Sequence, residues 1–191
     1  MAKLFEEISD TLRAFIEAQP MFFVGTAPSG ADGHVNLSPK GGKGLFQVTG
    51  PLGFAYVDLM GSGIETIAHL RENGRIVVMF CAFEGPPRIL RLHGRGSVVQ
   101  AGEPEFDALI ERCAFDEPEV AEARRSVIRV AVERVADSCG YGVPLMEVTG
   151  RRDHYDLATK KRLRVMGSDG FVDHVREKNA DSIDGLPALE S

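Results

Sequence analysis

Short apolar runs separated by turn residues dominate about the first hundred positions of this chain. Runs of this length, rich in Val, Ile, Phe and Tyr and bounded by Gly, Pro and Asn, are typical of β-strands. Tight turns join the first four runs, which favours an antiparallel meander over a parallel sheet. Six such strands with one short helix among them predict a mainly β protein whose sheet closes into a small barrel. The predicted strands are 21–26, 35–38, 45–48, 54–60, 75–82 and 89–99.

Helical spacing of apolar residues marks the beginning and the end of the chain. Leu4, Ile8 and Leu12 share one helical face and predict an N-terminal amphipathic helix. A further strand at 127–132 is expected to be the last of the barrel. The other predicted helices are 64–73, 103–113, 153–162 and 170–178.

These segments predict a single domain over residues 1–191, a length that allows one sizeable core with a few added helices. We expect an N-terminal helix at 1–19 and a barrel with inserted helices at 20–135. A C-terminal loop and helical extension follows at 136–191.

The charge balance argues against two classes of partner. The formal net charge is -6, whereas nucleic acids and anionic membranes both favour a basic surface. No run of 18 or more apolar residues is present, and the N-terminus turns acidic too early for a signal peptide. We therefore expect a cytoplasmic protein that binds neither nucleic acid nor membrane.

The cysteines and histidines do not have metal-ligand spacing. Cys81, Cys113 and Cys139 are far apart and form no C-x-x-C pair, so reduced, buried thiols account for them. None of the five histidines lies in an H-E-x-x-H motif or at ligand spacing from a cysteine. We expect no metal.

The candidate binding feature is the segment Gly61-Ser62-Gly63-Ile64-Glu65-Thr66, which connects a strand to a helix. Unpaired N–H groups and the positive end of the helix dipole favour an anion here, most often a phosphate. The same residues also fit a capping box, in which Ser62 and Glu65 satisfy each other's backbone N–H groups without any ligand. The residues alone leave both interpretations open.

A dinucleotide-binding interpretation of this segment is weaker. Gly61 and Gly63 follow a strand, and Glu84 lies about 20 residues further on, where a ribose-binding acid belongs. However, Thr66 replaces the third glycine, and only one strand–helix–strand unit is visible. A nicotinamide-dependent Rossmann enzyme is therefore the least favoured alternative.

From about residue 21 to residue 99, the order of motifs resembles the pyridoxamine 5′-phosphate oxidase-like family, whose fold is an FMN-binding split β-barrel. The stretch 35–40, Val-Asn-Leu-Ser-Pro-Lys, resembles the family strand that lies along the flavin ring and ends in a phosphate-binding lysine. Tyr56-Val57-Asp58 resembles the next contact strand, and 61–66 resembles the phosphate loop. The segment 88–94, which contains Arg91, also follows the family order.

The resemblance implies a six-stranded antiparallel split β-barrel with peripheral helices, FMN as the cofactor, and a homodimer with flavin sites at the subunit interface. Arg91 lies in mid-strand and needs an anionic partner, which could be Glu84, Asp58 or the flavin. The implied cofactor-binding residues are Asn36, Leu37, Ser38, Lys40, Val57, Asp58, Ser62, Gly63, Thr66 and Arg91.

The phosphate loop departs from the family pattern. Pyridoxamine phosphate oxidases carry an arginine and a lysine just after the glycine-serine of this loop, where this chain has Gly63 and Ile64. Each missing charge-assisted hydrogen bond is worth about 1.5–3 kcal/mol. The chain also contains no tryptophan, a residue of the enzyme's C-terminal region. These departures argue against pyridoxamine phosphate oxidation itself but leave FMN binding, with Lys40 as the compensating charge.

We therefore expect an FMN-dependent oxidoreductase that acts on an unidentified small molecule, and we assign no catalytic residue. The backbone N–H groups of 36–38 are the candidates to face N1 and the C2 carbonyl of the flavin. The alternative is a non-catalytic flavin or haem carrier or sensor on the same barrel, with His93 or His174 as the haem ligand.

Overall fold

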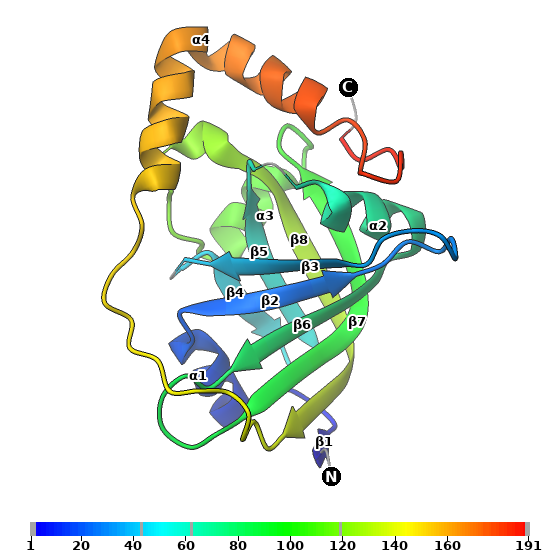
Figure 1. The fold of residues 1–191 in the computed structure, drawn as a ribbon, viewed down its shortest axis with the longest axis vertical. Helices are drawn as coiled ribbons and strands as arrows, with labels where there is room; N and C mark the ends of the chain where they lie inside the picture. The colour runs from blue at the N-terminus through cyan, green and yellow to red at the C-terminus, as the bar shows by residue number, and fades with distance from the viewer. Residues whose placement is uncertain (1–2, 43, 62, 119, 190–191) are drawn as a thin grey trace.

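Eight antiparallel strands form one curved sheet in the residues that the structure describes (Figure 1). The structure is a computed structural model and describes residues 3–42, 44–61, 63–118 and 120–189. The predicted mainly β split barrel with peripheral helices is confirmed, but its described strands number eight rather than six. The strands are β1 (Lys3–Phe5), β2 (Met21–Thr26), β3 (Asn36–Gly41), β4 (Phe46–Gly50), β5 (Gly53–Leu59), β6 (Arg75–Cys81), β7 (Ile89–Gln100) and β8 (Arg124–Ser138).

The strand order is β3-β2-β6-β7-β8-β5-β4, and β1 pairs with β8 outside that order. The predicted N-terminal helix is wrong in its first turns, because Lys3–Phe5 pairs with β8 as a strand. The helix begins only at Asp10, after Ser9, whose hydroxyl accepts a hydrogen bond from the Leu12 N–H at 3.4 Å. The last long strand is also longer than the predicted 127–132, because β8 pairs with β1, β5 and β7 along its length.

Side chains alternate between two apolar clusters across β5. Phe54 and Tyr56 point into the main cluster inside the barrel, which also holds Phe22, Phe46 and Phe80. The neighbouring Ala55 and Val57 belong to a second cluster, which packs β5, β7 and β8 against a helix on the outside. Both faces of β5 are therefore buried, and a polar side chain on this strand needs internal partners.

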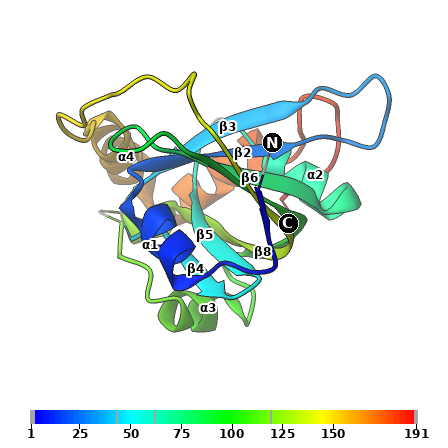
Figure 2. The same cartoon turned by 90° about the horizontal axis from the view of Figure 1, so that it is seen from below.

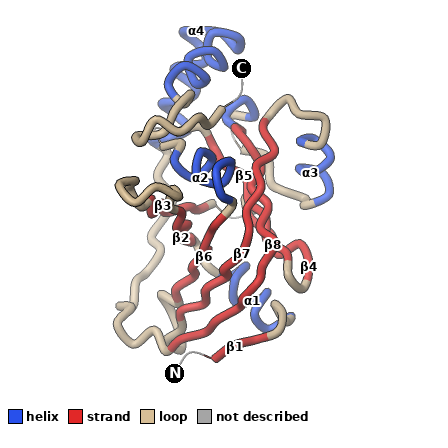
Figure 3. Tube along the Cα trace, turned by 90° about the vertical axis from the view of Figure 1, so that its right-hand side faces the viewer, coloured by secondary structure: helices blue, strands red, loops and turns tan. Residues whose placement is uncertain are grey.

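Five helical elements in the described part of the chain cover the ends and the outer face of the barrel. Figure 2 shows α3 outside the sheet, whereas α1 covers one end of the barrel, where its Leu12 and Ile16 join the main cluster. Figure 3 shows α4 at the end of the molecule opposite α1. The two predicted C-terminal helices are the two helical segments of α4, which meet at a non-helical kink at Gly167 (φ 72°, ψ 172°). The elements are α1 (Asp10–Ala18), α2 (Glu65–Asn73), α3 (Phe106–Arg112), the 3-10 turn η1 (Ala121–Ala123) and α4 (His154–Lys178).

The strand that carries the predicted flavin contacts, β3, lies at one edge of the sheet and pairs with β2. It extends beyond the predicted 35–38 and continues through Pro39, which pairs with Phe23. An edge strand tolerates proline because one side of its backbone needs no ladder partner.

Among the described residues, no helix is long and apolar enough to cross a membrane.

Candidate functional site

A buried carboxylate between two cations forms the centre of the candidate site. Asp58 on β5 is 1% exposed. Its Oδ1 accepts from the Lys40 Nζ at 2.8 Å, and its Oδ2 lies 2.8 Å from the Arg125 Nε and 2.7 Å from an Arg125 terminal nitrogen. The fold thus joins two predicted site residues, Lys40 and Asp58, through strands β3 and β5. We call Lys40, Asp58 and Arg125 the charge cluster.

The charge cluster keeps Asp58 ionised and carries an excess positive charge. Burial by itself raises the pKa of Asp58, but the charges and hydrogen bonds of Lys40 and Arg125 outweigh it, so that the pKa is lowered overall. Two cations against one carboxylate leave one net positive charge. Lys40 keeps a side chain that is 23% exposed, with N–H donors beyond the one used on Asp58. The cluster can therefore attract an anion.

Arg125 connects the charge cluster to two other segments. One of its terminal nitrogens donates to the Gly63 carbonyl at 2.9 Å, and the other donates to the Asn179 Oδ1 at 2.5 Å. Gly63 belongs to the predicted phosphate loop, and Asn179 follows α4. Arg125 was not among the predicted site residues. The available signal was its position at the start of a strand whose next residues, 126–128, are apolar or small, where a charge needs a buried partner.

A second polar group ties the start of α2 to β2 and β3. The Asn36 Nδ2 donates to the Thr26 Oγ1 at 3.1 Å and to the Thr66 Oγ1 at 3.0 Å, and the Asn36 Oδ1 accepts from the Ser38 Oγ at 2.9 Å. Thr26 is also 3.0 Å from the His69 Nδ1. We call these five residues the polar chain. Three of them, Asn36, Ser38 and Thr66, were predicted site residues, whereas Thr26 and His69 were not.

The predicted phosphate loop is partly described. Ser62 lies outside the described residues, so its predicted roles in a capping box and in cofactor binding stay predictions. The residue before α2 is Ile64, which makes no side-chain cap, and its N–H donates to the Glu65 carboxylate at 3.0 Å. Gly63 is exposed and lies beside Arg125. The anion interpretation of this loop therefore depends on charge from β3 and β8.

Three predicted site residues lie apart from the charge cluster. Leu37 points away from it and is 66% exposed. The Val57 side chain lies in the outer apolar cluster, on the other face of β5 from Asp58. Arg91 donates to the Ser138 hydroxyl at 3.1 Å. It pairs with Ala136, while Asp58 pairs with Ser126 further along β8. Its neighbours Leu90 and Leu92 point into the main cluster, so the Arg91 side chain leaves the opposite, outer face of β7.

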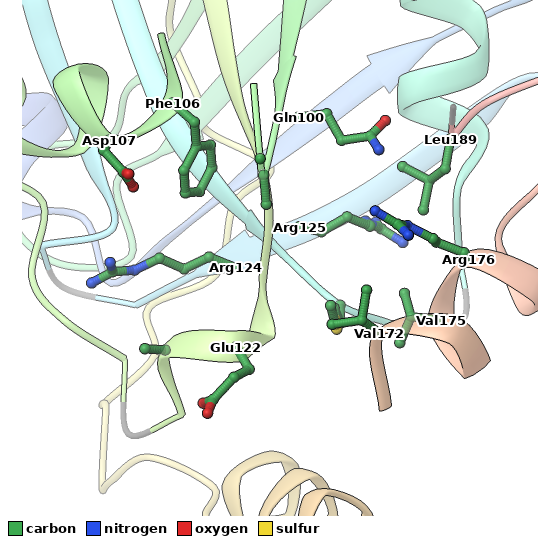
Figure 4. A pocket seen from close by; sticks show the side chains of 14 residues that line it. Gln100, Phe106, Asp107, Glu122, Arg124, Arg125, Val172, Val175, Arg176 and Leu189 are labelled. Atoms are coloured by element: carbon green, nitrogen blue, oxygen red, sulfur yellow. The ribbon is translucent and has the colours of Figure 1, made fainter. Parts of the chain in front are cut away.

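A cavity of about 410 Å³ adjoins the charge cluster through Arg125. Figure 4 shows Arg124 and Arg125 on opposite sides of β8, with Val172, Val175 and Arg176 contributed by α4. The Arg124 Nε is buried and has no hydrogen-bond partner among the described residues. The volume suits a small organic molecule. The remaining lining residues are Met60, Gln100, Ala101, Gly102, Phe106, Asp107, Ala121, Glu122 and Leu189.

The first turns of α4 come close to the charge cluster. Burial raises the pKa of Tyr155 to about 12, and the charge of Asp58 contributes to the same rise. The neighbouring Asp156 is buried and pairs with Arg151 at 2.7 Å. The C-terminal extension therefore supplies part of the surroundings of the site.

Comparison with known proteins shows the family to which the chain belongs. The family model for pyridoxamine 5′-phosphate oxidase matches residues 8–139. A pyridoxamine 5′-phosphate oxidase family protein of Aspergillus flavus, ustO, is 38% identical over 201 residues, which cover 100% of this chain and 79% of the fungal protein. The chain therefore belongs to the pyridoxamine 5′-phosphate oxidase family, as its motifs predicted.

Solved structures show more distant likeness. The conserved hypothetical protein Rv2991 of Mycobacterium tuberculosis is 19% identical, with a TM-score of 0.48, and the match covers 78% of this chain and 98% of that one. An FMN-binding protein of Syntrophomonas wolfei is 18% identical, with a TM-score of 0.44, and the match covers 65% of this chain and 82% of that one. The family assignment rests on the family model and the fungal relative.

Proposed function

We propose that this protein binds FMN and acts as a cytoplasmic FMN-dependent oxidoreductase on a small molecule. The observation that carries the proposal is the charge cluster beside Gly63 in a chain of this family. Its excess positive charge compensates in part for the arginine and lysine that the pyridoxamine phosphate oxidases carry in this loop and that this chain lacks. When bound, FMN supplies the electron transfer, and the protein supplies binding and orientation.

The residues present fit this cofactor. Lys40 and the backbone N–H groups of the loop would hold the phosphate, because they are donors next to a net positive cluster. The backbone N–H groups of 36–38 lie on an edge strand, where those that point away from β2 are free to meet the flavin carbonyls. Asp58 is a positioning residue in this arrangement, because it holds Lys40 and Arg125 at 2.7–2.8 Å.

Titration with FMN tests the proposal. We expect the purified protein to be yellow, or to take up added FMN at micromolar concentration with quenching of flavin fluorescence. Lys40→Gln should raise the Kd for FMN about tenfold or more, because a charge-assisted hydrogen bond is worth about 1.5–3 kcal/mol. Lys161→Gln, at an exposed lysine on α4, is the matched control and should leave the Kd unchanged. A colourless protein that ignores added FMN would contradict the proposal.

Reduction of the bound flavin separates an enzyme from a carrier. We expect NADPH or NADH to bleach the flavin absorbance on the timescale of turnover. A stable flavin spectrum in the presence of both donors would instead favour the non-catalytic binding protein, for which the missing basic pair of the loop is the supporting observation. The same departures lead us to expect no oxidation of pyridoxamine 5′-phosphate.

We further propose a homodimer with flavin sites at the subunit interface. The supporting observation is the exposed apolar surface of β3 and the residue before it, since Val35 is 78% exposed and Leu37 is 66% exposed. Large apolar side chains at such exposure beside a binding site are typical of a surface that a partner covers.

A further inference from the structure

The direction of the hydrogen bonds in the polar chain follows from counting donors around Asn36. With its Nδ2 toward Thr26 and Thr66 and its Oδ1 toward Ser38, both amide N–H groups and the amide oxygen are used. If the amide were turned over, the oxygen would face both threonines and one N–H would have no partner among the described residues. Asn36 is half-buried, and the first orientation is favoured because it alone pairs both amide N–H groups and the amide oxygen.

This orientation determines the role of Thr26. Because the Thr26 Oγ1 accepts from Asn36, its own hydrogen is available to the His69 Nδ1, 3.0 Å away. Thr26 is 4% exposed and His69 is fully buried, so this hydrogen has no access to bulk water. The contact therefore makes the Nδ1 an acceptor and places the ring hydrogen on the Nε2.

The other tautomer of His69 leaves more groups unpaired. With hydrogen on the Nδ1, both the Thr26 hydrogen and the Nε2 lone pair would lack partners in the described part of the chain. With hydrogen on the Nε2, only that N–H lacks one. Burial lowers the pKa of His69, against the opposite pull of Asp184, Glu65 and Glu72, and so favours the neutral ring.

We infer that neutral His69, protonated on the Nε2, is a positioning residue that fixes the direction of the polar chain, so that Ser38 donates its hydrogen to Asn36 and offers a ligand only oxygen lone pairs. Ser38 then accepts from a ligand N–H or O–H and does not donate to a phosphate or a carbonyl. This inference rests on the proposed FMN site for the identity of that ligand.

The chemistry of FMN selects one contact. FMN donates hydrogen bonds from the N3–H of its oxidised ring and from its ribityl hydroxyls, while the ring carbonyls and the phosphate dianion only accept them. Because β3 is the strand expected to lie along the flavin ring, the ring N3–H is the donor assigned to Ser38, and the phosphate is left to Lys40 and the loop at 61–66. The hydrogen bonds that run from His69 through Thr26 and Asn36 to Ser38 thus contribute to recognition of the flavin ring rather than of the phosphate.

Nitrogen NMR of the ligand-free protein tests the tautomer without any flavin. With ¹⁵N-labelled histidine, we expect the His69 signals to show a protonated Nε2 and an unprotonated, hydrogen-bonded Nδ1. Thr26→Val should shift the Nδ1 signal by removing its donor, and Thr159→Val, at a buried threonine of α4, should not. A protonated Nδ1 in the wild-type protein would overturn the inference.

Titrations with FMN and with 3-methyl-FMN, which lacks the N3 hydrogen, test the contact of Ser38. The wild-type protein should prefer FMN about tenfold, the scale of one hydrogen bond, and Ser38→Ala should reduce the preference to about twofold or less. His69→Asn, whose amide can accept from Thr26, should keep the preference, while His69→Leu should lose it.

Two outcomes would count against the inference while leaving FMN binding intact. One is equal affinity of the wild-type protein for both flavins, and the other is an unchanged preference in Ser38→Ala. If the wild-type protein binds neither flavin, the proposed function fails. The ¹⁵N signals of His69 alone then decide the direction of the hydrogen bonds in the polar chain. Ser38 is half-buried on an edge strand, so its alanine variant is expected to fold.

Discussion

At the scale of single residues, the charge cluster joins stability to binding. Asp58 is held from two strands by Lys40 and Arg125, and Arg125 is itself 4% exposed. A buried carboxylate of this kind is costly to desolvate, and its removal would leave the neighbouring cations without a buried counter-charge. The same three side chains therefore support both the fold and the proposed phosphate site.

Asp58→Asn should destabilise the protein by about 3 kcal/mol, because it leaves Arg125 buried without its carboxylate. Urea denaturation followed by circular dichroism measures this loss. Glu133→Gln is the matched control, since its pair with Arg95 at 3.5 Å is exposed and should contribute little. Equal stability of the two variants would show that the charge cluster is not a structural support.

The pKa of Asp58 predicts an acid limit to this contribution. Because its folded pKa lies below the usual value of 3.8, the unfolded chain takes up the proton first as the pH falls. The stabilisation is present in full above the unfolded pKa and is lost as the pH falls through the folded one. Between about pH 5 and pH 3, stability should therefore fall more steeply in the wild-type protein than in Asp58→Asn, as urea midpoints at each pH would show.

At the scale of elements, the sheet depends on one close approach between β7 and β8. The ladder register shifts between His93 and Gly94, opposite Val132. A Cβ atom on Gly94 would lie 2.0 Å from the Ala131 carbonyl oxygen, far inside van der Waals contact. Glycine is needed here because the two backbones nearly touch, and the long strands bend at this point.

Gly94→Ala should lower the stability by about 3 kcal/mol or more, because the backbone of β8 must move away from the added methyl group. Differential scanning calorimetry should show a fall in Tm of roughly 6–12 °C. Gly142→Ala provides the matched control, since a Cβ there meets nothing within 4 Å. A Tm equal to that of the control would mean that the strands separate at little cost.

The elements also show what the sequence could predict. Short runs of apolar, β-forming residues identified the strands that pack against the main cluster, such as β2 and β5, because local composition is enough to mark a buried strand. The strand at Lys3–Phe5 was missed because it depends on pairing with a distant segment, Val135–Asp137. Arg125 was missed for a similar reason, since its partners lie 67 and 54 residues away in the sequence.

The candidate site was predicted where its motif is local and missed where it depends on the fold. Asn36, Ser38, Lys40 and Asp58 lie in two short family motifs, and the structure brings them near the start of α2. Arg91 shares the family order, but the length of β8 separates it from Asp58. Order along the chain does not reveal at which end of a long strand a side chain lies.

At the scale of the whole molecule, the apolar residues at β3 predict association. Leu37→Glu should shift the protein from dimer to monomer in sedimentation velocity or light scattering, because it places a charge in the proposed interface. Its folding should be unaffected, since Leu37 is 66% exposed. The same change at Leu157, an exposed leucine on α4 at 59%, is the control. A wild-type monomer at micromolar concentration would contradict the proposed dimer.

Pro39 has a further consequence for how this surface meets a partner. An unpaired strand edge invites uncontrolled addition of another strand, and proline interrupts the row of donors that such addition needs. Its place in the middle of β3 therefore protects the edge against growth into aggregates while leaving the side chains of the strand available. A partner that docks here is recognised through its side chains and ligands rather than by extension of the sheet.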